Sequence, residues 1–214
     1  MEMVLNKNNS LIKLAETIAD NKMILGDQLV DIGLSGPNLE ATVASVSMAQ
    51  SELGHARLLY RWAQELKGRN ASGMDVKYQT GKAFQNVVDA HNWITLITAI
   101  YTVNLGTDLI MKAITDAENQ RSNPPFTKMF REQNETIIYT QGWVESLLND
   151  KGSIPARTIK ALNNASLETV KWLESIETDN LLISENQIVE NANLVSQFQN
   201  IIRELTQGGV VSNV

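Results

Sequence analysis

The 214-residue sequence contains no cysteine, which excludes disulfides, thiolate metal sites, iron–sulfur clusters and a cysteine nucleophile. It contains only four prolines, and each lies between long periodic segments: Pro37, Pro124, Pro125 and Pro155. It also lacks the alternating valine-rich segments that predict β-strands. Basic residues are fewer than acidic ones, and the formal net charge of −6 makes unaided binding to nucleic acid or an anionic membrane a poor expectation. Together these absences predict an all-α protein without a nucleic-acid partner.

The sequence also lacks an uninterrupted apolar segment of the ~18 residues that would predict a membrane span. Its most apolar segment, residues 93–114, is interrupted by Asn104, Asp108 and Lys112. The N-terminal sequence MEMVLNKNNS has neither the apolar core nor the small-residue cleavage pattern of a signal peptide. We therefore expect a cytoplasmic protein with no membrane partner.

Apolar residues recur at helical spacing over most of the chain. Two long hairpins with short turns predict an antiparallel four-helix bundle, followed by two additional C-terminal helices. Residues 9–206 should form a single domain, after a frayed segment 1–8 and before a flexible tail 207–214. The expected helices span residues 9–33, 39–67, 82–118, 125–149, 155–178 and 185–206.

The segment MAQSELGHARLLYRWAQEL, residues 48–66, places two polar residues in a helix that otherwise presents a small and apolar face. Glu52 shares that face with Ala49 and Ala56, and His55 follows Glu52 by three residues. An unpaired carboxylate is expensive to bury, so Glu52 requires an exposed position, a basic partner or a metal ion. The E-x-x-H spacing lets one helix offer an oxygen and a nitrogen ligand to one cation.

The depth of each hairpin indicates which residues could join Glu52 and His55. If helices one and two turn near residue 36, Asp20 lies level with Glu52. If helices three and four turn near residue 122, Asp108 lies close to the level of Glu135. Four carboxylates and one histidine in a bundle core are the composition of a carboxylate-bridged dimetal site, and such ligands suit iron or manganese.

This depth argument leaves alternatives open. Asp31 ranks lower than Asp20 because it would lie roughly 16 Å from the level of Glu52. A shift of one helical turn would bring Glu16 or Lys22 in place of Asp20, and Asn104 or Lys112 in place of Asp108.

The candidate ligands also have simpler interpretations as ion pairs or solvated residues. Glu52 and His55 could pair with each other, or with Arg57 or Arg61; Asp20 could be solvated; and Glu135 could pair with Arg131.

Three longer segments resemble one known family: ADNKMILGDQLVDIGLSGPNLEATVASVSMAQSELGHARLLYRWAQELKG, NWITLITAIYTVNLGTDLIMKAI and REQNETIIYTQGWVESL. Over roughly residues 15–175 the chain is similar to the ferritin-like subunits of bacterial phenylacetyl-CoA epoxidase, a multicomponent ring monooxygenase of phenylacetate degradation. That family has a catalytic subunit, with a di-iron centre held by carboxylates and two E-x-x-H motifs, and a structural subunit with a degraded site.

The chain combines features of both subunits. ILGDQL and GLSGP look more like the structural subunit, whereas SELGHARLLY matches a catalytic E-x-x-H. The resemblance implies that Asp108 and Glu135 match ligands of the third and fourth helices. However, Ile138 stands where the second histidine would be, and isoleucine cannot bind a metal.

From this mixture we expect a structural or accessory subunit with a partial dimetal site. The alternatives are a catalytic di-iron or manganese–iron oxygenase or oxidase, and a stand-alone ferritin-like metal-binding protein. Where metal is retained, the cofactor would be two iron ions or a manganese–iron pair. The expected partners are a second copy or a second ferritin-like subunit, and a reductase. The candidate metal ligands are Glu52, His55, Asp108, Glu135 and Asp20.

Overall fold

The computed structural model describes residues 8–70, 79–117 and 127–208, and all regular structure within these ranges is helical. The long helices are α2 (Asn9–Asp31), α3 (Leu39–Leu66), α5 (Trp93–Thr115), α6 (Thr127–Leu148), α7 (Ile154–Glu177) and α9 (Leu194–Gly208). Three short elements join them: η1 (Gly33–Ser35), α4 (Gln85–Val88) and α8 (Asn180–Ser184). The predicted all-α, ferritin-like architecture is confirmed.

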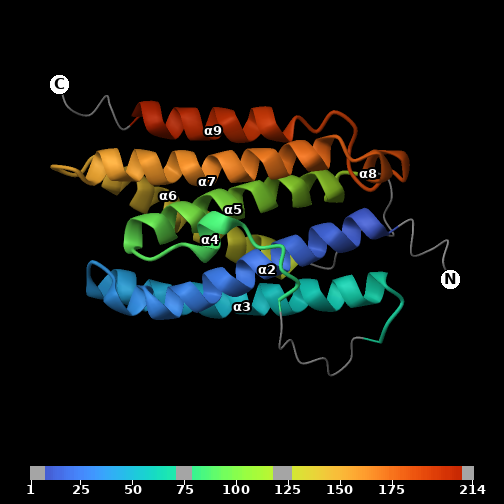
Figure 1. Cartoon of the computed structure of the whole chain (residues 1–214), viewed down its shortest axis with the longest axis horizontal. Coiled ribbons are helices and arrows are strands. Elements are labelled where there is room, and N and C mark those ends of the chain that lie inside the picture. Colours follow the sequence, from blue (N-terminus) through green and yellow to red (C-terminus); the bar gives the residue numbers. More distant parts are fainter. Residues whose placement is uncertain (1–7, 71–78, 118–126, 209–214) are drawn as a thin grey trace.

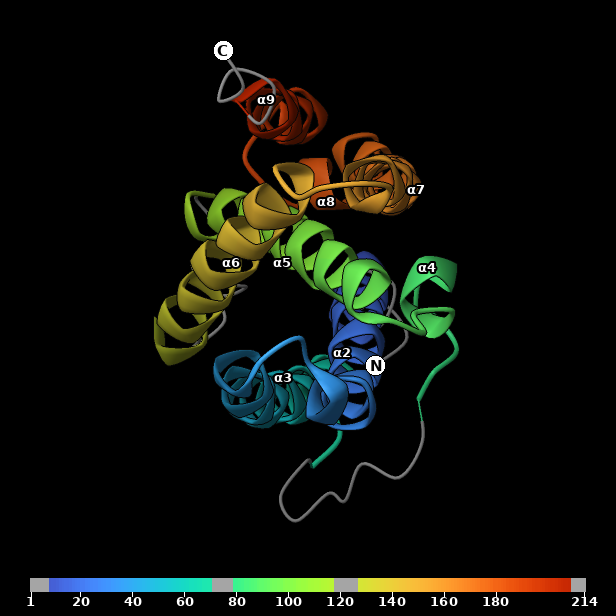
Figure 2. The same cartoon turned by 90° about the vertical axis from the view of Figure 1, so that its left-hand side faces the viewer.

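The α2–α3 hairpin forms one side of the molecule, α5 and α6 lie in the middle, and α7 and α9 lie beyond them (Figure 1). Seen end-on, α6 leans from the side of α3 toward α7 (Figure 2). Helices α2, α3, α5 and α6 are therefore the predicted bundle, and α7 and α9 are the two additional helices.

Helix α5 is the central element, because it contacts α2, α6, α7 and α9. By length and composition it could cross a membrane, but 94% of its most apolar window is buried inside the protein. Core helices of soluble proteins pass the same test, so its hydrophobicity is explained by its central position.

Two glycines, one in α2 and one in η1, allow a close approach to α3. A Cβ atom built on Gly26 would lie 2.6 Å from Leu53 Cγ, and one built on Gly33 would lie 2.3 Å from Ser45 Cβ. Any larger residue would force these helices apart. Gly33 and Ser45 are centred on residue 39, and Lys22 and Glu52, which are joined by a hydrogen bond, are centred on residue 37. The hairpin therefore mirrors about a point between residues 37 and 39, beyond the expected residue 36.

Two helix starts differ from the sequence prediction. The helix expected from residue 82 begins at Trp93, because Asn92 accepts a hydrogen bond from the backbone N–H of Thr95 in a capping box. The helix expected from residue 185 begins at Leu194. Before it, three asparagines adopt positive φ angles, which a continuing helix forbids: Asn186, Asn191 and Asn193.

Several expectations fall on parts of the chain outside the described residues. Residues 1–7 of the expected frayed N-terminus and residues 209–214 of the expected tail are outside the described ranges. The turn expected near residue 122 also lies outside them.

Candidate functional site

A closed polar cluster lies in the core where α2, α3 and α5 meet. It consists of Lys22 from α2, Glu52 from α3 and Asn104 from α5, and all three residues are 0% exposed. The Lys22 ammonium donates to Glu52 Oε2 at 2.9 Å and to Asn104 Oδ1 at 2.6 Å. The Asn104 amide donates to Glu52 Oε1 at 2.8 Å. Each pair of side chains in the cluster is therefore joined by a hydrogen bond.

The cluster balances its own charge. Glu52 requires compensation because it is fully buried, and Lys22 supplies it at hydrogen-bond distance. On α2 and α3 the cluster also divides two apolar clusters: Ala19 and Ala56 belong to the larger, whereas Leu25 and Ala49 belong to the smaller. The ion pair thus joins the helices at the boundary between two parts of the core.

His55, one turn after Glu52, points to a different partner. Its Nε2 lies 2.9 Å from Glu132 Oε2 on α6, and because a carboxylate only accepts hydrogen bonds, this nitrogen carries the proton. Burial lowers the pKa of His55, and the Lys22 charge lowers it further, while Glu52 and Glu132 oppose the shift. His55 is therefore a neutral link between α3 and α6. Its Nδ1 is buried and has no hydrogen-bond partner among the described residues.

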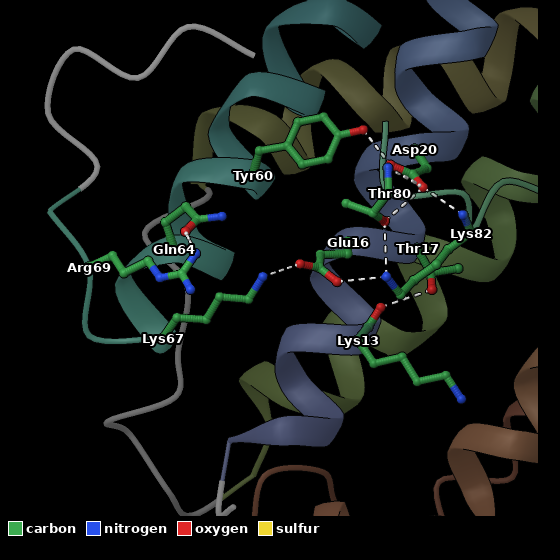
Figure 3. A network of polar contacts seen from close by, with 10 residues as sticks. All are labelled: Lys13, Glu16, Thr17, Asp20, Tyr60, Gln64, Lys67, Arg69, Thr80 and Lys82. Atoms are coloured by element: carbon green, nitrogen blue, oxygen red, sulfur yellow. Dashed lines mark hydrogen bonds and ion pairs between the residues drawn. The ribbon is translucent and has the colours of Figure 1, made fainter. Parts of the chain in front are cut away.

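Asp20 lies fully buried and holds a loop in place (Figure 3). It accepts hydrogen bonds from the Tyr60 hydroxyl, from the backbone N–H and hydroxyl of Thr80, and from the backbone N–H of Lys82. These donors leave Asp20 facing the loop before α4. It does not face Glu52.

Glu16, one turn before Asp20, extends the same network (Figure 3). It accepts from Lys67 and, at 2.8 Å, from Lys82. Burial alone would raise the pKa of Glu16, but the hydrogen bonds and charges of these two lysines outweigh it and lower the pKa. Glu16 and Asp20 thus have a structural role: they bind the loop before α4 to helix α2.

The two remaining candidates are not members of the cluster. Asp108 pairs with Lys112 one turn along α5, with Nζ and Oδ2 separated by 2.7 Å. Glu135 is exposed on α6. Ile138 is also exposed, by 62%, so the position that lacks the second histidine faces solvent.

The five predicted ligands are therefore not brought together. In the part of the chain that the structure describes, no group of three or more histidine, aspartate or glutamate side chains is arranged to hold a metal ion. Both oxygens of Glu52 are engaged, and the Lys22 ammonium puts a positive charge where a cation would bind. These residues do not fit a dimetal centre.

The residues that replace the expected ligands were visible in the sequence only in part. Lys22 and Asn104 are among the alternatives that the depth argument left open, and the Lys22–Glu52 contact places the mirror point of the α2–α3 hairpin near residue 37. Glu132 was missed as the partner of His55, because periodicity does not show which α6 residue faces α3.

A cleft of 480 Å³ lies between α3 and α6 beside the His55–Glu132 pair. It is mainly polar and belongs to the surface of the bundle. It is lined by Ser47, Gln50, Ser51, Gly54, His55, Leu58, Met129 and Glu132.

The sequence was compared with known proteins. The sequence model of a family described as "Phenylacetic acid catabolic protein" matches residues 1–209. No curated protein matches the chain.

Proposed function

Because the chain belongs to the phenylacetic acid catabolic protein family, we propose that it is a structural or accessory subunit of a multicomponent oxygenase that resembles phenylacetyl-CoA epoxidase. The observation that carries this proposal is the contact of Lys22 Nζ with Glu52 and Asn104 in the core. An oxygen-activating subunit needs carboxylates that are free to bind metal. Here the central carboxylate is neutralised by the chain itself.

In this role the chain would act through its surface. The buried ion pair and the His55–Glu132 pair tie α3 to α2, α5 and α6, which keeps the helical scaffold fixed without a cofactor. The substrate and the metal would reside in a second ferritin-like subunit, and a separate reductase would supply its electrons. This chain would stabilise and orient that subunit.

The first test is the metal content. The purified chain, expressed with added iron and manganese, should contain near-zero amounts of both metals by elemental analysis. The His55→Ala variant serves as the matched control, and its content should be the same. Stoichiometric metal that is lost in His55→Ala would overturn the proposal in favour of a metal-binding subunit.

The second test is assembly. Co-expression with a second ferritin-like protein encoded in the same genome should give a stable complex in which the metal is bound by that protein. Oxidation of an aromatic substrate should require the second protein and a reductase. Oxidation by this chain and a reductase alone would contradict an accessory role.

A further inference from the structure

The outer face of the α2–α3 hairpin, at the end where the two helices are joined, carries five exposed aliphatic side chains. Val30 lies on α2, Leu34 lies in η1, and Leu39, Val43 and Val46 lie on α3. Their exposed fractions range from 44% for Val30 and Val46 to 79% for Leu39. They are here called the hairpin patch.

Helix geometry makes the hairpin patch continuous. Leu39, Val43 and Val46 follow the spacing i, i+4, i+7 and so form one stripe. The close approach of Gly33 to Ser45 fixes the register of the two helices. In that register Val30 lies near the level of Val46, and both project from the side opposite the core.

The hairpin patch is held on a rigid support. At Gly26 and Gly33 the backbone packs so closely against α3 that an added Cβ atom would clash with Leu53 and Ser45. A preformed apolar surface loses little conformational entropy when a partner binds. Clusters of exposed aliphatic residues of this kind mark protein interfaces more often than isolated ones do.

The charges around the hairpin patch indicate the kind of partner. Residues 23–56 contain no lysine or arginine, whereas Asp27, Asp31 and Glu40 are exposed beside the aliphatic residues. Burial raises the pKa of Asp27, and the neighbouring Asp31 raises it further, so these two carboxylates repel each other. A partner that brings cations would relieve this repulsion.

The same charges argue against a second copy of the chain. A two-fold contact centred on the hairpin patch would place acidic residues against the same acidic residues, since such an interface is self-complementary. The nearest basic residues of the same stripe on α3, Arg57 and Arg61, lie roughly 20–27 Å along the helix from Val43. For these arginines to pair with the acidic residues, a second copy would have to lay the charged part of its α3 over the aliphatic residues.

We propose that the hairpin patch is the docking surface for a different protein, whose apolar ridge is bordered by lysine or arginine residues. This inference rests on the proposed function, since it takes that partner to be the second ferritin-like subunit. It adds the surface through which the subunits meet and the charge that the partner must carry.

The test uses the purified chain and the purified second ferritin-like subunit, with affinity measured by calorimetry at low and high salt. The double variant Leu39→Ser/Val43→Ser should bind at least about tenfold more weakly. Leu167→Ser removes another exposed leucine, 61% exposed on α7, and should bind normally. Circular dichroism should show unchanged folding in both, because the altered side chains are exposed.

A second pair of variants tests the charges. Glu40→Lys should weaken binding, and the loss should shrink as salt rises, because salt screens exposed charges. Glu174→Lys, an exposed acid on α7, should have no effect.

The outcomes separate the inference from the proposed function. A complex that is insensitive to Leu39→Ser/Val43→Ser would overturn the docking surface while leaving the accessory role intact. A homodimer that dissociates in this variant would identify a second copy as the occupant and overturn the inference. If no complex forms at either salt concentration, both the docking surface and the accessory role fail.

Discussion

Replacing Lys22 with methionine tests whether the buried ion pair holds the core together. Methionine fills a similar volume but leaves Glu52, which is 0% exposed, with only the Asn104 amide as a partner. Removing one member of a buried ion pair costs about 3–5 kcal/mol, because the other charge remains buried and uncompensated. Glu52→Gln should cost a similar amount, since it leaves the Lys22 ammonium without a counter-charge. If Glu52 were buried without a partner, Glu52→Gln would not lower the free energy of unfolding.

The double variant Lys22→Met/Glu52→Gln provides the control. The glutamine amide can both donate to and accept from Asn104, and no charge remains, so stability should return to within about 1–2 kcal/mol of the wild type. The assay is urea unfolding at pH 7.5, followed by circular dichroism. With an m-value of about 3 kcal/mol/M, each single variant should lower the midpoint by about 1–1.7 M. A Lys22→Met midpoint equal to that of the wild type would refute the reasoning, as would a double variant no more stable than the weaker single one.

Three further predictions concern single residues. The pKa of His55 is lowered by burial and by Lys22, so the unfolded chain takes up a proton at this residue more readily than the folded protein does. The free energy of unfolding should therefore decrease as the pH falls below about 6.5, the pKa of histidine in an unfolded chain. The difference between the urea midpoints at pH 7.5 and pH 5.5 should be smaller in His55→Gln than in the wild type. An equal difference in the two proteins would contradict this prediction. Asp20→Asn should cost about 2–3 kcal/mol, because an amide cannot accept from all its donors; an unaltered thermal melting temperature would count against it. Tyr101→Phe should be neutral or stabilising by up to about 1 kcal/mol in urea unfolding, since the buried hydroxyl has no partner among the described residues, and a clear loss would indicate an unseen bond.

Most of the fold could be predicted because long helices carry strong periodicity. The errors occurred where a local hydrogen bond decided the boundary. Residues 82–92 contain no proline, and their composition permits a helix, so the capping box of Asn92 was not evident. Before α9, the asparagines at positions 186, 191 and 193 were the available signal, because asparagine tolerates positive φ better than most residues.

The candidate site was predictable in its centre but not in its partners. The small and apolar face of α3 predicted that Glu52 needs an exposed position, a basic partner or a metal ion; in the structure Glu52 is 0% exposed and its partner is basic, Lys22. The choice among Asp20, Glu16 and Lys22 depended on the mirror point of the hairpin. That point is shifted by η1 and by the close contact at Gly33, which periodicity does not report.

The presence of Lys22 changes what the E-x-x-H spacing indicates in this chain. A buried Glu52 needs a cation, and either a metal ion or an ammonium group satisfies that need. Once Lys22 supplies the charge from the adjacent helix, Glu52 has a structural reason to remain, because losing either partner leaves a buried charge. His55 likewise has a structural partner in Glu132. Both residues of the motif are therefore explained by contacts that tie α3 to its neighbours, and the motif alone carries no argument for oxygen chemistry in this chain.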